Sequence, residues 1–195
     1  SHIPNALNLP IFNDDEYKKI GILYKQNPIE ANFFGASIAC RNIANMLETN
    51  RDILNHKNKI LLYCARGGNR SLSLYSVLVA LKFRVERLEN GYKTYRNYVI
   101  DYLKEVMNTK NFIVVHGLTG AGKTDLLKML EEKDIDNIDL EGIAQNSGST
   151  FGFITIDKKP PSQKKFETKI FEKLFFSKTD YIFIESESKR VGHVL

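Results

Sequence analysis

The sequence contains no tryptophan and only two cysteines among its 195 residues. Cys40 and Cys64 are too few for the disulfide framework of a small secreted domain, so we expect free thiols in a reducing compartment. No apolar run approaches the roughly 18 residues that a membrane-spanning helix needs, and the N-terminus lacks the basic and then apolar layout of a signal peptide. With 43% hydrophobic and 26% charged residues, the composition excludes disordered and fibrous classes. These features predict a soluble cytoplasmic protein.

Charge is unevenly distributed between the two halves. The formal net charge is +5, and up to Asn108 the sequence has 15 Lys and Arg against 10 Asp and Glu, whereas from Thr109 onward it has 13 of each. The excess positive charge therefore lies in the first half, where an anionic partner is favoured. The alternative is that a lysine-rich sequence scatters such charge without function.

In the first half, the hydrophobic pattern alternates between helices and strands. Cap-type residues at Asn13–Glu16 begin a short helix, and an apolar stripe predicts a long helix from Pro28 to about Thr49. Cys40 lies on that stripe, where we interpret it as a small buried side chain rather than a functional thiol. The further predicted elements are a strand at 59–63, a helix at 71–82, a strand at 85–88 and a helix from 92 to about 107. This order is typical of an α/β fold with a parallel sheet.

The same alternation restarts after a polar joint at residues 108–111. The predicted elements are a strand at 112–115, a helix at 123–132, a strand end at 138–140, a helix at 162–176 and a strand at 181–184. We therefore predict two α/β domains, residues 1–108 and residues 109–195.

A glycine-rich segment follows the first strand of the second domain. Residues 117–124 fit the P-loop pattern of a glycine, four residues and Gly-Lys-Ser/Thr, between a strand and a helix. In such a loop, backbone N–H groups and Lys123 face a phosphate, and Thr124 can hold Mg²⁺ through its hydroxyl. The alternative is an accidental glycine turn. The candidate phosphate-binding residues are Gly117, Gly120, Gly122, Lys123 and Thr124.

A carboxylate at a strand end could support Mg²⁺ beside such a phosphate. Glu185, which follows the apolar strand at 181–184, is the best placed, and Asp139 is a second option. Either could equally be an ordinary solvated carboxylate. We assign Glu185 to cofactor binding and predict no dedicated metal site.

A second loop with chemical potential begins at Cys64. Residues 64–71 read Cys-Ala-Arg-Gly-Gly-Asn-Arg-Ser between a buried strand and a helix. A thiol at this position faces the positive end of the helix dipole, loop N–H groups, Arg66 and Arg70, surroundings that lower a cysteine pKa from about 8.5 to about 3.5–7.5. We therefore predict that Cys64 is a catalytic nucleophile and that Arg66 and Arg70 are catalytic anion ligands. A structural cysteine would not require two arginines and two glycines around it.

The spacing of a cysteine, five residues and an arginine resembles two families. Single-domain rhodaneses, which carry sulfur as a cysteine persulfide, usually have one residue fewer in this loop, whereas the related dual-specificity phosphatases have the longer loop. No histidine or aspartate lies nearby in sequence as an obvious general acid, which weakens the phosphatase interpretation. The identity of the transferred group therefore stays open on this loop alone.

A rhodanese-like cysteine loop followed by a P-loop resembles the bacterial tRNA 2-selenouridine synthase family. In the first half, Gly21–Gln26, Tyr63–Ser71 and Gly91–Arg96 match blocks of that family. In the second half the matching blocks, in the family's order, are residues 139–142, 148–152, 161–163 with 166–167, and 185–188 with Arg190 and Gly192. The resemblance spans nearly the whole chain.

This resemblance implies a rhodanese-like parallel-sheet domain followed by a P-loop NTPase-like α/β domain. Family members replace the sulfur of wobble 2-thiouridine in tRNA with selenium from selenophosphate, through an S-geranyl intermediate made with geranyl diphosphate. Cys64 matches the family's essential cysteine. Given this activity, our own hypothesis is that Arg66 and Arg70 receive selenophosphate and that Lys123 with Thr124 holds the diphosphate, aided by Mg²⁺. The implied partners are tRNA and an enzyme that supplies selenophosphate, with no membrane.

Basic and aromatic residues alternate just after the cysteine helix, as in surfaces that contact RNA phosphates and bases. They are Lys82, Arg84, Arg87, Tyr92, Lys93, Tyr95, Arg96 and Tyr98. A solvated helix face with half-buried tyrosines explains each of them about as well. A second basic stretch comprises Lys158, Lys159, Lys164 and Lys165.

The chain departs from the family pattern at its ends. It begins with Ser1 rather than methionine, lacks the strand with Asp-x-Arg expected before His2, and offers about three strands in the P-loop domain where such sheets usually have five or so. We therefore expect both domains to be truncated. Two other functions stay open: a sulfurtransferase or cysteine-dependent phosphatase coupled to a nucleotide-binding P-loop, and a non-enzymatic nucleotide switch.

Overall fold

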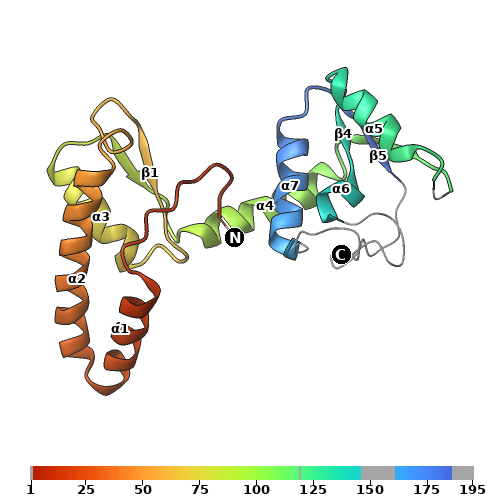
Figure 1. Ribbon diagram of the computed structural model, residues 1–195. Helices are drawn as coiled ribbons and strands as arrows, with labels where there is room; N and C mark the ends of the chain where they lie inside the picture. Colours follow the sequence, from red (N-terminus) through yellow and green to blue (C-terminus); the bar gives the residue numbers. More distant parts are fainter. Residues whose placement is uncertain (1, 119, 146–160, 186–195) are drawn as a thin grey trace. The chain divides into compact units, whose positions relative to one another are not determined.

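The computed structural model describes residues 2–118, 120–145 and 161–185. The chain forms two compact units that divide between Tyr95 and Arg96, inside a single helix (Figure 1). Each unit contains helices and a small parallel sheet, which confirms the predicted α/β class at that level. Among the described residues, no helix has the length and apolar character needed to cross a membrane.

The first unit begins with a helical hairpin, α1 (Asp14–Gln26) and α2 (Pro28–Thr49). Asn13 and Glu16 cap α1 reciprocally, because each side chain accepts a hydrogen bond from the backbone N–H of the other. Asn27 caps α2, and Pro28 occupies the first helical position, where its missing N–H costs nothing. Two adjacent caps therefore fix the sharp turn between the helices.

The buried face of α2 is narrower than its apolar pattern predicts. The buried residues are Ala31, Gly35, Ile38, Ala39, Ile43 and Met46. Cys40 is exposed, and so are Ile29 and Phe33. The prediction of a buried Cys40 was therefore wrong, because the apolar residues of α2 cover two neighbouring faces and only one of them is packed.

The sheet of the first unit holds two parallel strands. The elements are β1 (Ile60–Leu62), α3 (Asn69–Ala80), β2 (Val85–Arg87) and α4 (Tyr92–Val106). Ile60 lies opposite Val85 and Leu62 opposite Arg87. Because the strands run in the same direction, the loop after β1 and the turn after β2 leave from the same edge of the sheet. Leu74 and Leu78 of α3 pack into the core of this unit.

The second unit is built on a three-stranded parallel sheet in the order β3-β5-β4. Its elements are β3 (Asn111–Val115), α5 (Lys123–Glu132), β4 (Asn137–Ile138), α6 (Leu140–Ala144), α7 (Gln163–Phe175) and β5 (Tyr181–Glu185). The predicted strand end at 138–140 stops earlier, at Ile138. Asp139 instead caps α6 by accepting a 2.7 Å hydrogen bond from the Gly142 N–H.

The C-terminal part of α4 packs within this second unit. Tyr102 meets Phe171 of α7 edge-on, with ring centres 5.2 Å apart. Arg96 forms a largely buried ion pair with Glu167. The compact units therefore divide after Tyr95, whereas the predicted domain boundary, after Asn108, lies past the end of α4. As a boundary between functional domains, residue 108 stays a prediction.

Candidate functional site

Cys64 lies two residues after β1, in the loop that leads into α3. Ser71, in the first turn of α3, places its Oγ 3.3 Å from the Cys64 Sγ and 3.3 Å from the Gly68 carbonyl oxygen. The thiol is half-buried. The strand, the loop and the helix N-terminus therefore converge on one sulfur atom.

Hydrogen bonds make this thiol acidic. Burial raises the pKa of Cys64, but the Ser71 hydroxyl and the backbone N–H groups of Ser71, Arg66 and Gly68 outweigh it and lower the pKa from 9.0 to about 7. These donors favour the thiolate because they can satisfy its charge without water. The sequence predicts a low pKa from the helix dipole, the loop N–H groups and the charges of Arg66 and Arg70. In the structure the lowering comes from the loop N–H groups and from the Ser71 hydroxyl.

The turn after β2 holds the cysteine loop in place. The Tyr92 N–H donates to the Cys64 carbonyl oxygen at 2.8 Å, and Arg87 Nη1 donates to the Gly67 carbonyl oxygen at 2.6 Å. Gly91 has a φ of +59°, and a Cβ at this position would overlap the Cys64 carbonyl oxygen. Only glycine therefore allows this close approach of the two backbones.

The two arginines of the loop are exposed. The guanidinium carbon of Arg70 lies 5.5 Å from the centre of the Tyr17 ring on α1, within the range of a cation–π interaction. Arg66 lies within the loop itself. Both cations are thus open to an anion that approaches from solvent.

The phosphate loop of the second unit joins β3 to α5. Gly120 and Gly122 have φ values of +81° and +83°, in the left-handed region that favours glycine. Lys123 Nζ donates to the Gly117 carbonyl oxygen at 3.0 Å, so its ammonium group lies across the loop. Thr124 is half-buried in the first turn of α5. The five predicted phosphate ligands therefore share one short strand-to-helix connection.

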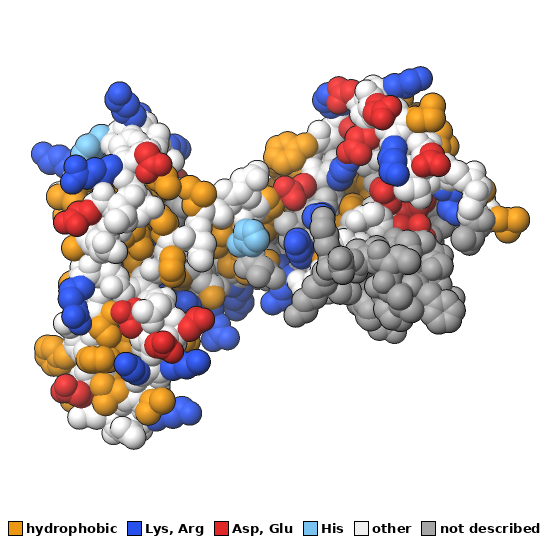
Figure 2. Space-filling view, in the orientation of Figure 1, with side chains coloured by type: hydrophobic (Ala, Val, Ile, Leu, Met, Phe, Trp, Pro, Cys, Tyr) orange, Lys and Arg blue, Asp and Glu red, His pale blue; other side chains and the backbone are white. Residues whose placement is uncertain are grey.

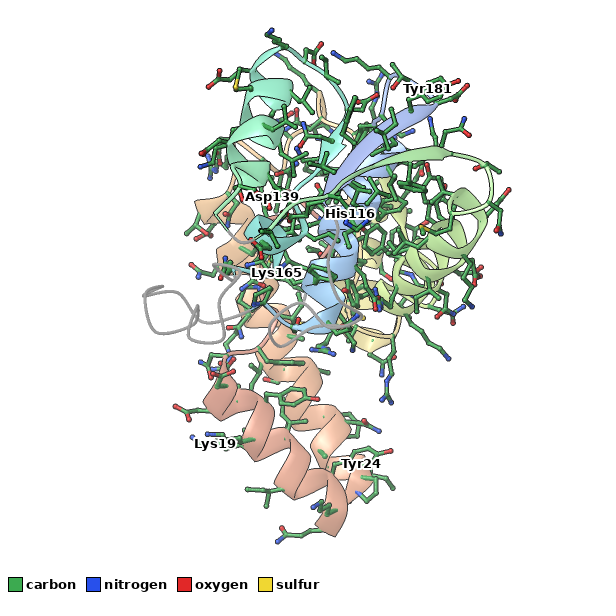
Figure 3. The ribbon with its side chains drawn as sticks, turned by 90° about the vertical axis from the view of Figure 1, so that its right-hand side faces the viewer. Lys19, Tyr24, His116, Asp139, Lys165 and Tyr181 are labelled. Carbon is green, nitrogen blue, oxygen red and sulfur yellow. The ribbon has the colours of Figure 1, made fainter. Side chains whose placement is uncertain are left out.

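The carboxyl ends of the three strands bring the candidate acids to this loop. Val115 pairs with Glu185, and Ile138 pairs with Ile184. Glu185 therefore stands beside the strand that leads into the P-loop. In Figure 3, His116, which follows β3, and Asp139, which follows β4, lie at the same end of the sheet.

Glu185 is only 2% exposed, and its Oε1 accepts a 2.7 Å hydrogen bond from the Glu141 N–H. Burial, together with the charges of Asp139 and Glu141, outweighs that bond and raises the pKa of Glu185 from 4.5 to about 7. Glu185 and Asp139 had been alternatives from sequence, and the structure places them together.

No cluster of three or more His, Cys, Asp or Glu suited to a metal occurs in the part of the chain that the structure describes. An Mg²⁺ ion that fits these residues would need phosphate oxygens for most of its ligands, beside the Thr124 hydroxyl and a carboxylate.

Sequence comparisons of the two halves with known proteins point to the same family. Residues 110–195 match the tRNA 2-selenouridine synthase AAA domain. Over 194 residues the chain is 31% identical to the tRNA 2-selenouridine synthase of Pseudomonas syringae pv. tomato and 32% identical to that of Shewanella halifaxensis, covering 97% of this chain in each case. The chain belongs to the tRNA 2-selenouridine synthase family. It spans about half the length of these relatives, 51% and 52% respectively.

Two further matches cover a smaller share of this selenouridine synthase family member. The tRNA 2-selenouridine synthase of Sulfurovum sp. is 36% identical over 151 residues, which are 76% of this chain and 40% of that protein. A crystal structure of the N-terminal domain of a Clostridium difficile 630 protein, described as ATP/GTP binding, is 40% identical. It covers 51% of this chain and 78% of its own, with a TM-score of 0.45.

Part of the basic stretch predicted to contact RNA has structural partners in this family member. Arg87 holds the cysteine loop, and Arg96 pairs with Glu167. Tyr92 is half-buried. Two of its cations therefore have partners within the protein, whereas Lys82, Arg84 and Lys93 are exposed. As an RNA-binding surface the stretch stays a prediction.

Two residues at the cysteine loop have no functional signal in the sequence. Ser71 ends the cysteine motif, and in the structure its hydroxyl contacts the Cys64 sulfur. Tyr17 lies 53 residues before Arg70, and no sequence signal joins them. The family blocks at 148–152 and 186–192, and also Lys158 and Lys159, lie outside the described residues, while Lys164 and Lys165 are exposed at the start of α7.

Proposed function

We propose that this protein replaces the sulfur of wobble 2-thiouridine in tRNA with selenium. The selenium donor is selenophosphate, and the intermediate is S-geranyl-2-thiouridine formed from geranyl diphosphate. The observation that carries the proposal is the pairing of two anion-binding loops in one chain of this family: a cysteine with a pKa of about 7, and a P-loop beside a buried carboxyl group.

The P-loop suits the geranyl transfer. The thiouridine sulfur attacks the first carbon of the geranyl group, the carbon–oxygen bond breaks, and diphosphate leaves with the bonding electrons while the uridine loses its N3 proton. The loop N–H groups at Gly117, Gly120 and Gly122 and the Lys123 ammonium stabilise the charge that develops on the diphosphate. An Mg²⁺ ion on Thr124, supported by Glu185, would supply further Lewis-acid stabilisation.

The cysteine loop suits the delivery of selenium. The Cys64 thiolate attacks the phosphorus of selenophosphate, so that a sulfur–phosphorus bond forms, the phosphorus–selenium bond breaks and hydrogen selenide leaves. Hydrogen selenide then attacks C2 of the geranylated base and expels geranylthiol, and water hydrolyses the phosphocysteine to phosphate. No atom changes oxidation state in these three reaction steps. Attack at selenium would instead leave a perselenide on Cys64 and expel the phosphorus in a reduced form, as phosphite rather than phosphate.

The loop's residues fit this phosphoryl step. Arg66 and Arg70 supply charge for a tetrahedral phosphoryl group, and five residues between cysteine and arginine make a wide cradle. The Ser71 hydroxyl, 3.3 Å from the sulfur, stabilises the thiolate both before attack and when it leaves during hydrolysis.

We further propose that the partners are tRNA and an enzyme that supplies selenophosphate, in the cytoplasm. Residues 2–95 contain 13 Lys and Arg against 8 Asp and Glu, a net charge of +5. The unit that carries Cys64 therefore has the charge that a polyanion requires.

The test is mass analysis of the nucleosides in 2-thiouridine tRNA after incubation with full-length protein, selenophosphate and geranyl diphosphate. Cys64→Ala should accumulate the S-geranyl nucleoside and incorporate no selenium. Lys123→Ala should form no S-geranyl nucleoside, yet should still incorporate selenium into tRNA that is geranylated beforehand. Cys40→Ala is the matched control. Selenium incorporation by Cys64→Ala would refute the cysteine assignment, and geranylation by Lys123→Ala would refute the P-loop assignment.

The acidic thiol in a loop with an arginine six positions later also favours a second function, a cysteine-dependent phosphatase. With this function, the protein would release phosphate from an aryl phosphate and incorporate no selenium, and Cys64→Ser would abolish the phosphate release. A rhodanese-type sulfurtransferase would instead carry thiosulfate sulfur as a persulfide on Cys64. Tight nucleotide binding without any tRNA binding would indicate a nucleotide switch.

A further inference from the structure

One exposed side of α1 begins next to the cysteine loop. Tyr17, Gly21 and Tyr24 follow one another at four- and three-residue spacing and so lie on one side of the helix. The two tyrosines are 57% and 56% exposed. A Cβ added at Gly21 would meet no atom within 4 Å, so the surface between the rings is open. We call these three residues the tyrosine stripe.

The stripe is not part of the hydrophobic core. The side of α1 that packs is formed by Glu16, Ile20 and Leu23, which are half-buried. Ile20 lies against α2, since a Cβ at Gly35 would be 3.6 Å from its Cδ1. The tyrosine stripe therefore adds nothing to this packing, and both rings are accessible at the surface.

Cations border the stripe. Lys18 and Lys25 are exposed and lie on the neighbouring side of α1, and the Arg70 guanidinium lies over the Tyr17 ring. Figure 2 shows hydrophobic, basic and acidic side chains on the part that holds the hairpin, the acidic ones of α1 being confined to its first turn. In Figure 3 Lys19 and Tyr24 lie on opposite sides of the hairpin. Aromatic rings interleaved with cations are the surface that single-stranded nucleic acid binds, through stacked bases and paired phosphates.

Building on the proposed function, we propose that the tyrosine stripe, with Lys18, Lys25 and Arg70, binds the unpaired nucleotides that flank the modified base of the RNA substrate. Tyr17 and Tyr24 lie about 10 Å apart along the helix axis, so each ring takes a separate base. Because Arg70 belongs to the cysteine loop, RNA that follows the stripe is led to Cys64. Lysine is depleted in protein–protein interfaces, so the bordering lysines disfavour a protein partner.

The test is a fluorescence anisotropy titration of the full-length protein with a labelled anticodon stem-loop RNA. Tyr24→Ala should weaken binding about 5- to 150-fold, the range measured for loss of one stacking aromatic. Tyr24→Phe keeps the ring and should bind like the unchanged protein. Lys25→Gln should reduce the slope of log affinity against log salt by about 0.7, whereas Lys19→Gln, the matched control, should leave it unchanged. Circular dichroism confirms that each variant is folded.

The outcomes separate this inference from the proposed function. Wild-type affinity in Tyr24→Ala would overturn the inference, even if selenium incorporation by the unchanged protein upheld the proposed function. Loss of self-association in Tyr24→Ala without a change in RNA affinity would make the stripe a protein interface and also overturn it. Absence of RNA binding by the unchanged protein would overturn both.

Discussion

The hydroxyl of Ser71 is predicted to set the acidity of Cys64, so Ser71→Ala should raise the pKa of the thiol. In the structure that pKa is about 7 instead of 9.0, and the Ser71 hydroxyl is the leading lowering contribution. A hydrogen bond to a charged group contributes about 1.5–3 kcal/mol, which corresponds to about one to two pKa units. The pKa in Ser71→Ala should therefore be about 8 to 9.

The thiolate fraction translates this shift into reactivity. At pH 7 a thiol with a pKa of about 7 is half ionised, whereas one at 9.0 is only about 1% ionised. The thiolate population at pH 7 should therefore fall about 5- to 50-fold in Ser71→Ala. A more basic thiolate is also intrinsically more nucleophilic, so the reaction rate at one pH combines two opposing effects. The midpoint of the pH profile reports the pKa of the thiol alone.

Alkylation by iodoacetamide, followed by mass spectrometry from pH 5 to pH 10, gives that midpoint. The experiment uses a Cys40→Ala background, because the exposed Cys40 would otherwise react as well. Ser73→Ala is the matched control: the Ser73 hydroxyl bonds to the Asn69 carbonyl oxygen at 2.9 Å. A midpoint that stays near 7 in Ser71→Ala would refute the assignment to the Ser71 hydroxyl and leave the backbone N–H groups of the loop as the cause.

Three further predictions concern the framework of the two loops. Gly91→Ala should lower the melting temperature and raise the thiol midpoint, because its Cβ would overlap the Cys64 carbonyl oxygen; Gly68→Ala, whose Cβ would meet no atom within 4 Å, should change neither. Glu185 holds a proton in the folded state between its ordinary pKa of 4.5 and about 7, so stability should fall as pH rises through that window; thermal melts of Glu185→Gln should lack this slope. Arg96→Met should lower the urea midpoint of unfolding, because it leaves the Glu167 carboxylate buried without its partner. The double variant Arg96→Met, Glu167→Met should recover part of the loss. A double variant no more stable than Arg96→Met would contradict this account.

The element pattern could be predicted from the sequence because local signals agree with the packing. The short apolar strands at 60–62 and 181–185 and the capped helices at 14–26 and 28–49 all form near their predicted positions. Asp139 shows where this fails. Its side chain bonds the Gly142 N–H and starts a helix in a segment whose apolar residues indicate a strand end.

The candidate site was predictable in outline only. The P-loop and the cysteine loop are contiguous motifs, so spacing alone located Cys64 and Lys123. The contacts around these loops connect residues far apart in sequence: Arg70 to Tyr17, and Glu185 to the Glu141 N–H. Cys40 was misjudged because helical periodicity shows which residues share a face but not whether another element covers that face.

The central claim is that the two loops act in order, with geranyl transfer at the P-loop and selenium delivery at Cys64. The most direct measurement is the nucleoside that Cys64→Ala makes from 2-thiouridine tRNA in the presence of both co-substrates. S-geranyl-2-thiouridine without selenouridine is the result predicted here. Formation of 2-selenouridine by this variant would contradict the account.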